Sequence, residues 1–384
     1  MELGFALFAL ATAWGSGNIG PVAAEISHDL DVSLAAVGVL GGTAFFAGLV
    51  TAKLGAAYLT RRLGAGHCAR LACLAVVAGN ALLAASPIYA GLAAGRVIAG
   101  AGLGLALVIG PVLAKQAGGV RIVGVFGGAV MLGVAGALGI GSLMRVAGID
   151  WRLDFALSGA LGLVALAMLP RAGDVTVPSG SVLAVARLSV RRLAPWRLEL
   201  LFTTSLGVPY VLGVWLVPYL TTDVGLSAAG AGLLGFALYA LTTVLRPEGA
   251  RLDAEGRSTA ALGGVAPLAA AAGLVLLALA GGWPLAAVGI AVAGAGFAIP
   301  YATMYDEAQR LFPGSRIAAV GLLSVGGNLL PLAVMPAIGA AISSGDGELA
   351  LLALAAVPLL AGLANLKPAA PDDSGAAASR APRP

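Results

Sequence analysis

The sequence predicts an all-α integral membrane protein with twelve transmembrane helices in two pseudo-symmetric halves of six. Two observations lead to this prediction. The chain of 384 residues is 59% hydrophobic and only 10% charged, whereas a soluble domain carries about 25% charged residues, so most of its surface must face lipid. Apolar runs of about 20 residues, the length that crosses a bilayer as a helix, also recur along the whole chain.

Each expected helix is an apolar segment of bilayer-spanning length. The first segment lacks a basic stretch before it, so we expect a retained helix rather than a cleaved signal peptide. Small residues at four-residue spacing, such as Gly100 and Gly104, allow the helices to pack closely. In chain order the segments are 3–26, 33–60, 65–86, 88–114, 122–145, 152–170, 199–221, 227–247, 259–281, 284–308, 316–342 and 348–366.

The positive charges indicate the orientation. Of the 22 Lys and Arg residues, Arg145 and Arg152 fall in predicted outer loops, Lys53, Arg96 and Arg246 fall within spans, and the rest fall in predicted cytoplasmic segments. Because Lys and Arg concentrate on the cytoplasmic side of membrane proteins, we expect a multi-pass protein of an inner (cytoplasmic) membrane with both termini in the cytoplasm.

A basic segment divides the chain. Residues 1–170 form the expected N-terminal half, 171–198 a central cytoplasmic loop, 199–366 the C-terminal half, and 367–384 a disordered cytoplasmic tail rich in Pro, Ala and Ser. Within the loop, VLAVARLSVRRL (182–193) places apolar residues on one helix face and arginines on the other. We therefore expect an amphipathic helix on the membrane surface there.

Several functions are disfavoured. The two cysteines, Cys68 and Cys73, lie near the start of one span, which argues against a disulfide framework. No cluster of His, Cys and carboxylates has metal-ligand spacing, and no glycine-rich phosphate loop follows a soluble strand. No nucleophile–base pair is visible, so we expect no metal, no cofactor and no enzymatic activity. The net charge of +4 is too small to indicate a nucleic-acid partner.

Local motifs strengthen the twelve-helix pattern. The loops after spans 2 and 8 read AYLTRRLGAG (57–66) and GARLDAEGR (249–257). Span 4 contains GRVIAGAGLG (95–104), span 5 contains GVAGALGIGSL (133–143), and span 6 begins IDWRLDF (149–155). In this order and spacing, and with a basic loop between six-helix halves, the motifs resemble those of the major facilitator superfamily over nearly the whole chain.

The resemblance implies a secondary transporter with alternating access to a site between its halves. It also implies gating roles for the two loops. The first loop departs from the family's signature G-x-L-a-D-r-x-G-r-r, because Arg61 replaces its Asp, and only Arg62 and Gly64 match well. The second loop matches the signature at Gly249, Asp253, Gly256 and Arg257.

Two cations lie at corresponding depths in the two halves, Lys53 in span 2 and Arg246 in span 8. A cation inside the membrane is costly unless it pairs or faces water, so the two are predicted to clamp a small anion between the halves. The alternative is that both extend to headgroups, or that Arg246 pairs with an acid. The candidate acids are Glu248, Asp253 and Asp306.

The stretch RPEGARLD (246–253) is similar to the R-P-x-G-G-x-L-x-D pattern of the nitrate/nitrite porter family. There, one basic residue of helix 2 and one of helix 8 hold the anion, which the resemblance carries over to Lys53 and Arg246. Lys53 keeps the charge of the family's arginine but lacks its planar fork. Oxalate/formate-type exchangers also use a helix 8 arginine, and R-P before this loop also occurs in sugar and drug exporters.

Further polar residues are candidates for the site. Arg96 either contacts the solute or bonds the first helix through Asn18. Asn18 and Asn328 each need a partner in lipid, from another helix or from the solute, and Tyr301 is a weaker cavity candidate. Asp306 is the best candidate for a coupling carboxylate, with a helix-end ion pair as the alternative. The other acids considered are Glu25, Asp154 and Glu307.

We therefore expect a monomeric transporter of a small anion or organic anion, working with protons or a counter-anion in the lipid bilayer. Export of a drug-like or sugar-like solute by proton antiport is the alternative, favoured by the glycine-rich span 5. A receptor or scaffold with this fold is a third possibility. It would fill its cavity with apolar side chains and keep Lys53, Arg96 and Arg246 at headgroups or in salt bridges.

Overall fold

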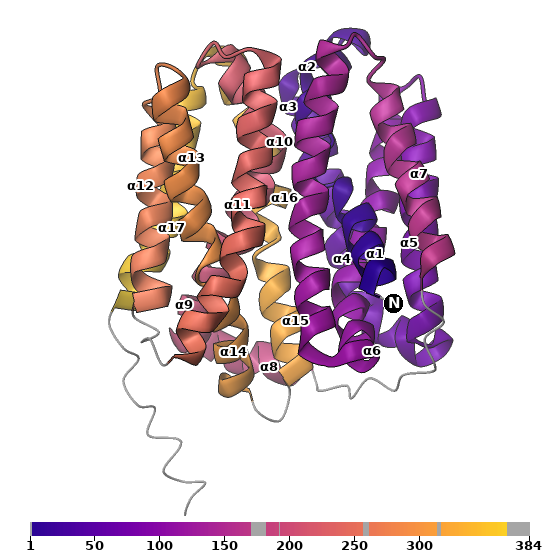
Figure 1. Ribbon diagram of the computed structural model, residues 1–384, viewed down its shortest axis with the longest axis vertical. Helices are drawn as coiled ribbons and strands as arrows, with labels where there is room; N and C mark the ends of the chain where they lie inside the picture. The colour runs from indigo at the N-terminus through magenta and orange to yellow at the C-terminus, as the bar shows by residue number, and fades with distance from the viewer. Residues whose placement is uncertain (1, 170–181, 192, 256–260, 313–315, 367–384) are drawn as a thin grey trace, which may run out of the picture.

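The computed structural model describes residues 2–169, 182–191, 193–255, 261–312 and 316–366. These residues are almost entirely helical, and the helices run side by side along one long axis (Figure 1). The helices of the first part of the chain, coloured indigo to magenta, lie next to those of the second part, coloured rose to yellow. This arrangement confirms the predicted fold class.

The first part of the chain supplies six crossings of the bundle. A π-helical turn (η2) interrupts the second crossing. One long helix, α6, contains both the fourth crossing, Tyr89–Ala114, and the fifth, Val125–Val146. The elements are α1 (Glu2–Trp14), η1 (Gly20–Val22), α2 (Ala23–Asp29), α3 (Leu34–Gly38), η2 (Val39–Ala44), α4 (Phe45–Leu63), α5 (Ala65–Ala85), α6 (Tyr89–Val146) and α7 (Arg152–Met168).

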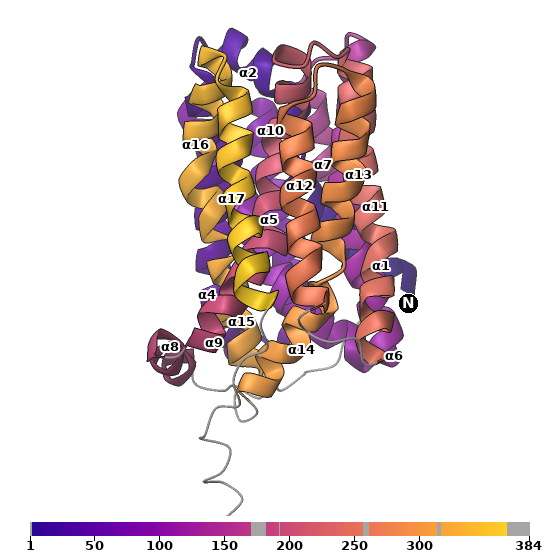
Figure 2. The ribbon, with the colours of Figure 1, turned by 90° about the vertical axis from the view of Figure 1, so that its left-hand side faces the viewer.

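The second part supplies six more crossings and a short helix, α8, that lies beside the bundle at its lower end (Figure 2). The elements are α8 (Val182–Arg191), α9 (Leu193–Phe202), η3 (Thr203–Gly207), α10 (Val208–Thr222), α11 (Ala228–Ala254), η4 (Ala261–Val265), α12 (Ala266–Ala278), α13 (Trp283–Ala298), α14 (Tyr301–Leu311), α15 (Arg316–Gly326), α16 (Leu329–Ser344) and α17 (Gly347–Leu366).

Most of the described crossings are long enough to span a bilayer. Among the described residues, nine stretches are long and apolar enough to cross a bilayer, and α1 and the stretch Leu262–Ala278 are shorter apolar helices. α7, with 17 residues, accounts for the remaining crossing. Several predicted spans are not continuous helices: the first breaks between Trp14 and Gly20, the tenth at Pro300 and the eleventh at Asn328.

The break in the first span is held by Arg96 of α6. Its guanidinium is fully buried and donates to the carbonyl oxygens of Gly15 (2.7 Å) and Leu40 (3.0 Å) and to the Asn18 side chain (3.0 Å). The same group lies 4.2 Å from the ring centroid of Phe45. Backbone groups that leave a helix inside a membrane need partners from the protein itself. Arg96 supplies them and joins the first, second and fourth crossings.

The upper end of the bundle, where α2 and α3 lie in Figure 1, is closed by contact between the second and eleventh crossings. A Cβ atom on Gly38 would lie 2.5 Å from the Met335 carbonyl oxygen, and one on Gly42 would collide with the Met335 side chain. The Thr43 hydroxyl also donates to the carbonyl oxygen of Leu332 (2.9 Å). Glycines therefore let two helix backbones touch here, as small residues do in membrane bundles.

We expect Arg96→Leu to lower the free energy of unfolding by at least about 2 kcal/mol, because hydrogen bonds to a buried charged group are lost and carbonyl oxygens are left unpaired. Arg62→Leu, at an exposed arginine of α4, is the control and should change stability by less than about 0.5 kcal/mol. Unfolding in detergent measures both. Equal stability of the two variants would contradict the role given to Arg96.

We expect Gly42→Leu to force the upper ends of the second and eleventh crossings apart. Gly55→Leu on α4 is the matched control, because no atom lies within 4 Å of a Cβ at Gly55. The reporter is maleimide labelling of Val214→Cys, since Val214 is fully buried against Gly41. Labelling should rise with Gly42→Leu and stay unchanged with Gly55→Leu. An equal effect of both changes would show that this contact does not close the upper end.

Candidate functional site

Arg246 is a buried cation within α11, not at the end of a helix, because α11 continues to Ala254. Its side chain is 8% exposed, and its guanidinium carbon lies 3.8 Å from the ring centroid of Tyr301 in α14. Its Nε is buried without a hydrogen-bond partner. Arg246 thus gains a cation–π contact, but that contact does not neutralise its charge.

No carboxylate in the described part of the chain forms an ion pair with Arg246. Glu248, one of the predicted partners, lies instead 3.1 Å from the Nε of Arg251. Arg251 also lies 3.6 Å from Glu255, so these exposed charges form a local network on α11. The side chains of Asp253 and Asp306, the other predicted partners, lie outside the described residues. The described site therefore holds an unbalanced positive charge.

Four tyrosines surround this charge. Tyr301 and Tyr305 on α14 have ring centroids 4.9 Å apart, and Tyr210 on α10 and Tyr239 on α11 are almost completely buried. Arg246 is close enough to Tyr210, Tyr239 and Tyr305 to interact with each electrostatically. Phenol rings from the second part of the chain thus lie around one guanidinium. We name Arg246 and these four tyrosines the tyrosine cluster.

The tyrosine cluster also reaches the first half of the chain. The ring centroid of Phe46, in α4, lies 5.2 Å from that of Tyr210. The Tyr239 hydroxyl donates to the carbonyl oxygen of Pro209. The Tyr210 hydroxyl makes no hydrogen bond to any described residue. It is therefore a donor available beside the unbalanced charge.

Lys53 occupies a separate place. Its ammonium donates to the hydroxyl of Ser324 (3.4 Å) and to the carbonyl oxygen of the same residue (3.5 Å), in α15. The Asn328 amide donates to that carbonyl oxygen as well. Lys53 and Asn328 thus meet at Ser324, whereas no described contact joins Lys53 to Arg246. The clamp formed by the two cations stays a prediction.

The remaining predicted residues are distributed as follows. Arg96 and Asn18 bond to each other at the break in the first span, one of the two predicted arrangements. Arg62 is exposed, with its guanidinium 5.3 Å from the ring centroid of Tyr58. Gly64 joins α4 to α5 at a φ of 79°, a conformation that favours glycine. Gly256 and Arg257 lie outside the described residues.

Sequence reasoning missed several of these groups. Tyr239, Tyr305 and Ser324 were not identified as neighbours of a cation. Tyr301 and Tyr305 are four residues apart, which places them on one helix face, and this spacing was the available signal. The positions of Tyr210 and Ser324 depend on how separate helices face each other.

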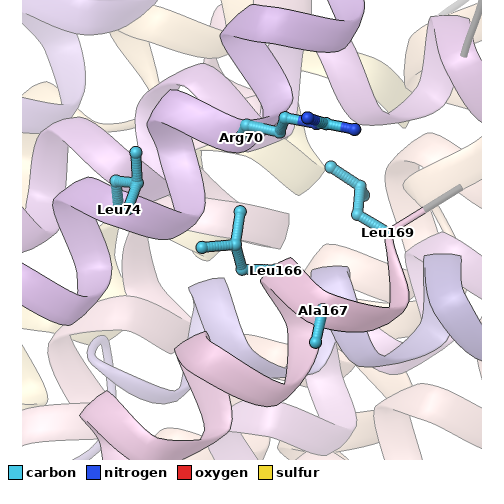
Figure 3. A pocket seen from close by; sticks show the side chains of 5 residues that line it. All are labelled: Arg70, Leu74, Leu166, Ala167 and Leu169. Atoms are coloured by element: carbon cyan, nitrogen blue, oxygen red, sulfur yellow. The ribbon is translucent and has the colours of Figure 1, made fainter. Parts of the chain in front are cut away.

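Two surface pockets lie away from the tyrosine cluster. One, of about 570 Å³, is lined by Arg70 and Leu74 of α5 and by Leu166, Ala167 and Leu169 at the end of α7 (Figure 3). The other, of about 440 Å³, lies at the upper end, where Tyr219, Asp223 and Glu348 line it. Neither pocket contains a cation predicted to bind solute, so we do not place the solute site in them.

Comparison with known proteins assigns the family. The sequence model of the Major Facilitator Superfamily matches residues 5–314. No curated protein matches the sequence. A crystal structure of a D-xylose-proton symporter is similar at a TM-score of 0.77, with 14% identity over 94% of this chain and 95% of that chain.

Two inward-facing structures are also similar. One is a bacterial homologue of the human lysosomal transporter Spinster in its occupied state, with a TM-score of 0.73 and 18% identity over 95% of each chain. The other is the xylose transporter XylE from E. coli, with a TM-score of 0.73 and 15% identity over 94% of each chain. At these identities the likeness concerns the fold alone. Since the family model covers most of the sequence, the chain belongs to the major facilitator superfamily, whose members are alternating-access membrane transporters.

Proposed function

We propose that this transporter carries a small organic anion, and that Arg246 binds the negative charge of that anion. The observation that carries the proposal is a buried guanidinium with no described carboxylate partner and with a buried Nε that makes no hydrogen bond. An unpaired buried charge is costly in a protein interior. A bound anion would remove that cost, whereas a neutral or cationic solute would not.

The tyrosine cluster supports an organic anion over a simple inorganic one. A guanidinium presents N–H donors in a planar fork that matches a carboxylate. The Tyr210 hydroxyl, free of described hydrogen bonds, offers one more donor. The rings of Tyr301 and Tyr305 offer apolar faces to a carbon skeleton. We infer a carboxylate with a small apolar or hydroxylated body as the substrate class.

We assign Lys53 to gating rather than to the anion. Its bonds to Ser324 join α4 of the first half to α15 of the second half. Opening the lower end of the bundle requires these two elements to separate, because alternating access moves one half against the other. Lys53 would then act as a latch that is closed in the present conformation, and Arg246 would bind the anion without it.

A sugar-like solute is the second candidate. It is favoured by the likeness to the D-xylose-proton symporter and to the xylose transporter XylE, although that likeness concerns the fold. Phenol hydroxyls and ring faces, as in the tyrosine cluster, suit a sugar as well. A neutral sugar would leave the charge of Arg246 without a counter-charge, so we rank a sugar below an organic anion.

We further propose that the lower end faces the cytoplasm of a bacterial-type inner membrane. Exposed cations gather there, at Arg61 and Arg62 of α4, Arg187 of α8 and Arg251 of α11. This is the distribution that the positive-inside rule expects. We also propose that residues 171–198 divide the two halves. We propose that the transporter is monomeric and is coupled to protons or to a counter-anion.

Arg246→Gln should abolish uptake of organic carboxylates into proteoliposomes, because the amide carries no charge to replace the guanidinium. Arg251→Gln is the matched control, since Arg251 lies on the same helix but is exposed and paired with Glu248 and Glu255. It should retain uptake within about twofold, as expected for an exposed pair of small energetic value. Unchanged uptake in Arg246→Gln, or uptake of xylose and not of carboxylates by the wild type, would overturn the proposal.

Lys53→Gln should slow transport but leave equilibrium binding of the anion intact, since Lys53 is bonded to Ser324 and not to the tyrosine cluster. Arg61→Gln, at an exposed position of α4, is the control. Binding is measured by calorimetry in detergent and transport in proteoliposomes. Loss of anion binding in Lys53→Gln would contradict the gating role and support the hypothesis that both cations bind the anion.

A further inference from the structure

A second buried charge site lies in the first half, around Asp154 of α7. The Asp154 side chain is fully buried, and its Oδ1 accepts a hydrogen bond from the Trp14 indole N–H (3.3 Å). Its Oδ2 is buried and has no hydrogen-bond partner among the described residues. A Cβ on Gly141 of α6 would lie 2.8 Å from Oδ2, so only glycine leaves room for the carboxyl group.

One cation faces this carboxyl group from the elements packed against α7. Arg145, in the last turn of α6, interacts with Asp154 electrostatically, although it forms no described ion pair with it. The Nε and Nη2 atoms of Arg145 are buried and without hydrogen-bond partners. Acceptor and donor groups that remain unpaired therefore lie in the same region.

Among the described residues, the other ionisable groups of the elements around Asp154 lie elsewhere. On α7 itself, Arg152 lies 3.8 Å from Asp29 and against the Trp151 ring. α1 has Glu2 as its ionisable group, at the opposite end of that helix. α5 runs antiparallel to α7, because Arg70 and Leu74 lie beside Leu166. Its ionisable residues are therefore far from Asp154; they are His67, Cys68, Arg70 and Cys73.

Trp14 links this carboxyl group to the break in the first span. It is the last residue of α1, and the next residue, Gly15, gives its carbonyl oxygen to Arg96. The indole ring also packs against Gly136 of α6. An ionised Asp154 holds the indole N–H by a charge-assisted hydrogen bond, and such bonds are about twice as strong as neutral ones. Gain or loss of a proton would therefore change how firmly Trp14 is held.

We propose that Asp154 is a proton-binding site of this transporter, and that its protonation releases Trp14 beside the break in the first span. A proton would neutralise a buried carboxyl group whose Oδ2 has no described partner, and the charge of Arg145 favours the carboxylate. In the ionised form, Arg145 moves to pair with Oδ2 and the indole stays bound. In the neutral form, the proton lies on Oδ2, Arg145 turns away and the indole bond weakens. The proposal does not depend on which solute is carried.

The test is a pH titration of Trp14 fluorescence in purified protein in lipid nanodiscs, taken as the difference between wild type and Trp14→Phe. We expect one transition in wild type, and none in Asp154→Asn, because the amide does not titrate. Arg145→Gln should raise the midpoint by about one pH unit, because it removes the charge that favours the carboxylate. Arg152→Gln, at the cation paired with Asp29, should leave the midpoint unchanged.

Infrared difference spectra between high and low pH provide a second readout. The band of a protonated carboxyl group should appear on acidification of wild type and be lost in Asp154→Asn. A Trp14 transition that persists in Asp154→Asn would overturn the proposal, as would a midpoint that does not move in Arg145→Gln. If Asp154→Asn does not fold, the Arg145→Gln midpoint and the wild-type infrared band decide the question.

Discussion

The absence of water from the membrane interior is the constraint on which this structure depends. Every backbone donor and acceptor there must find a partner in the protein, which is why the described chain is almost wholly helical. Where the first span breaks after Trp14, Arg96 supplies the missing donors to the carbonyl oxygens of Gly15 and Leu40. One buried guanidinium thereby makes an irregular segment possible at the centre of the first half.

The same constraint applies to the charged side chains buried in the bundle. Arg96 donates three hydrogen bonds to protein acceptors, and its Nη2 atom is buried without a partner. Arg246 is buried with an unpaired Nε, and Asp154 is buried with an unpaired Oδ2. We propose that a solute at Arg246 and a proton at Asp154 complete the hydrogen bonding of these two groups. The two groups lie in different parts of the chain, Asp154 in α7 and Arg246 in α11.

Much of the fold could be predicted from the sequence, because span length and apolar composition are local properties. The predicted span 65–86 corresponds to α5, Ala65–Ala85, and the predicted span 348–366 to α17, Gly347–Leu366. The candidate site was less predictable. The free-energy cost of burying a charge identified Arg246 from its place within an apolar span of the sequence. The partners of Lys53 and Arg246, by contrast, depend on the rotation of each helix toward its neighbours. Ser324 and Tyr210 could therefore not be assigned to them without the structure.

The central claim is that Arg246 carries an unpaired charge that an organic anion neutralises. The most direct test is the thermal unfolding of purified protein in the presence of carboxylates, neutral sugars and organic cations. A ligand that binds only the folded state at about 100 times its Kd stabilises it by about 2.7 kcal/mol. The account predicts that only carboxylates raise the Tm of the wild type, and that Arg246→Gln loses this rise. Stabilisation by sugars or cations that persists in Arg246→Gln would contradict it.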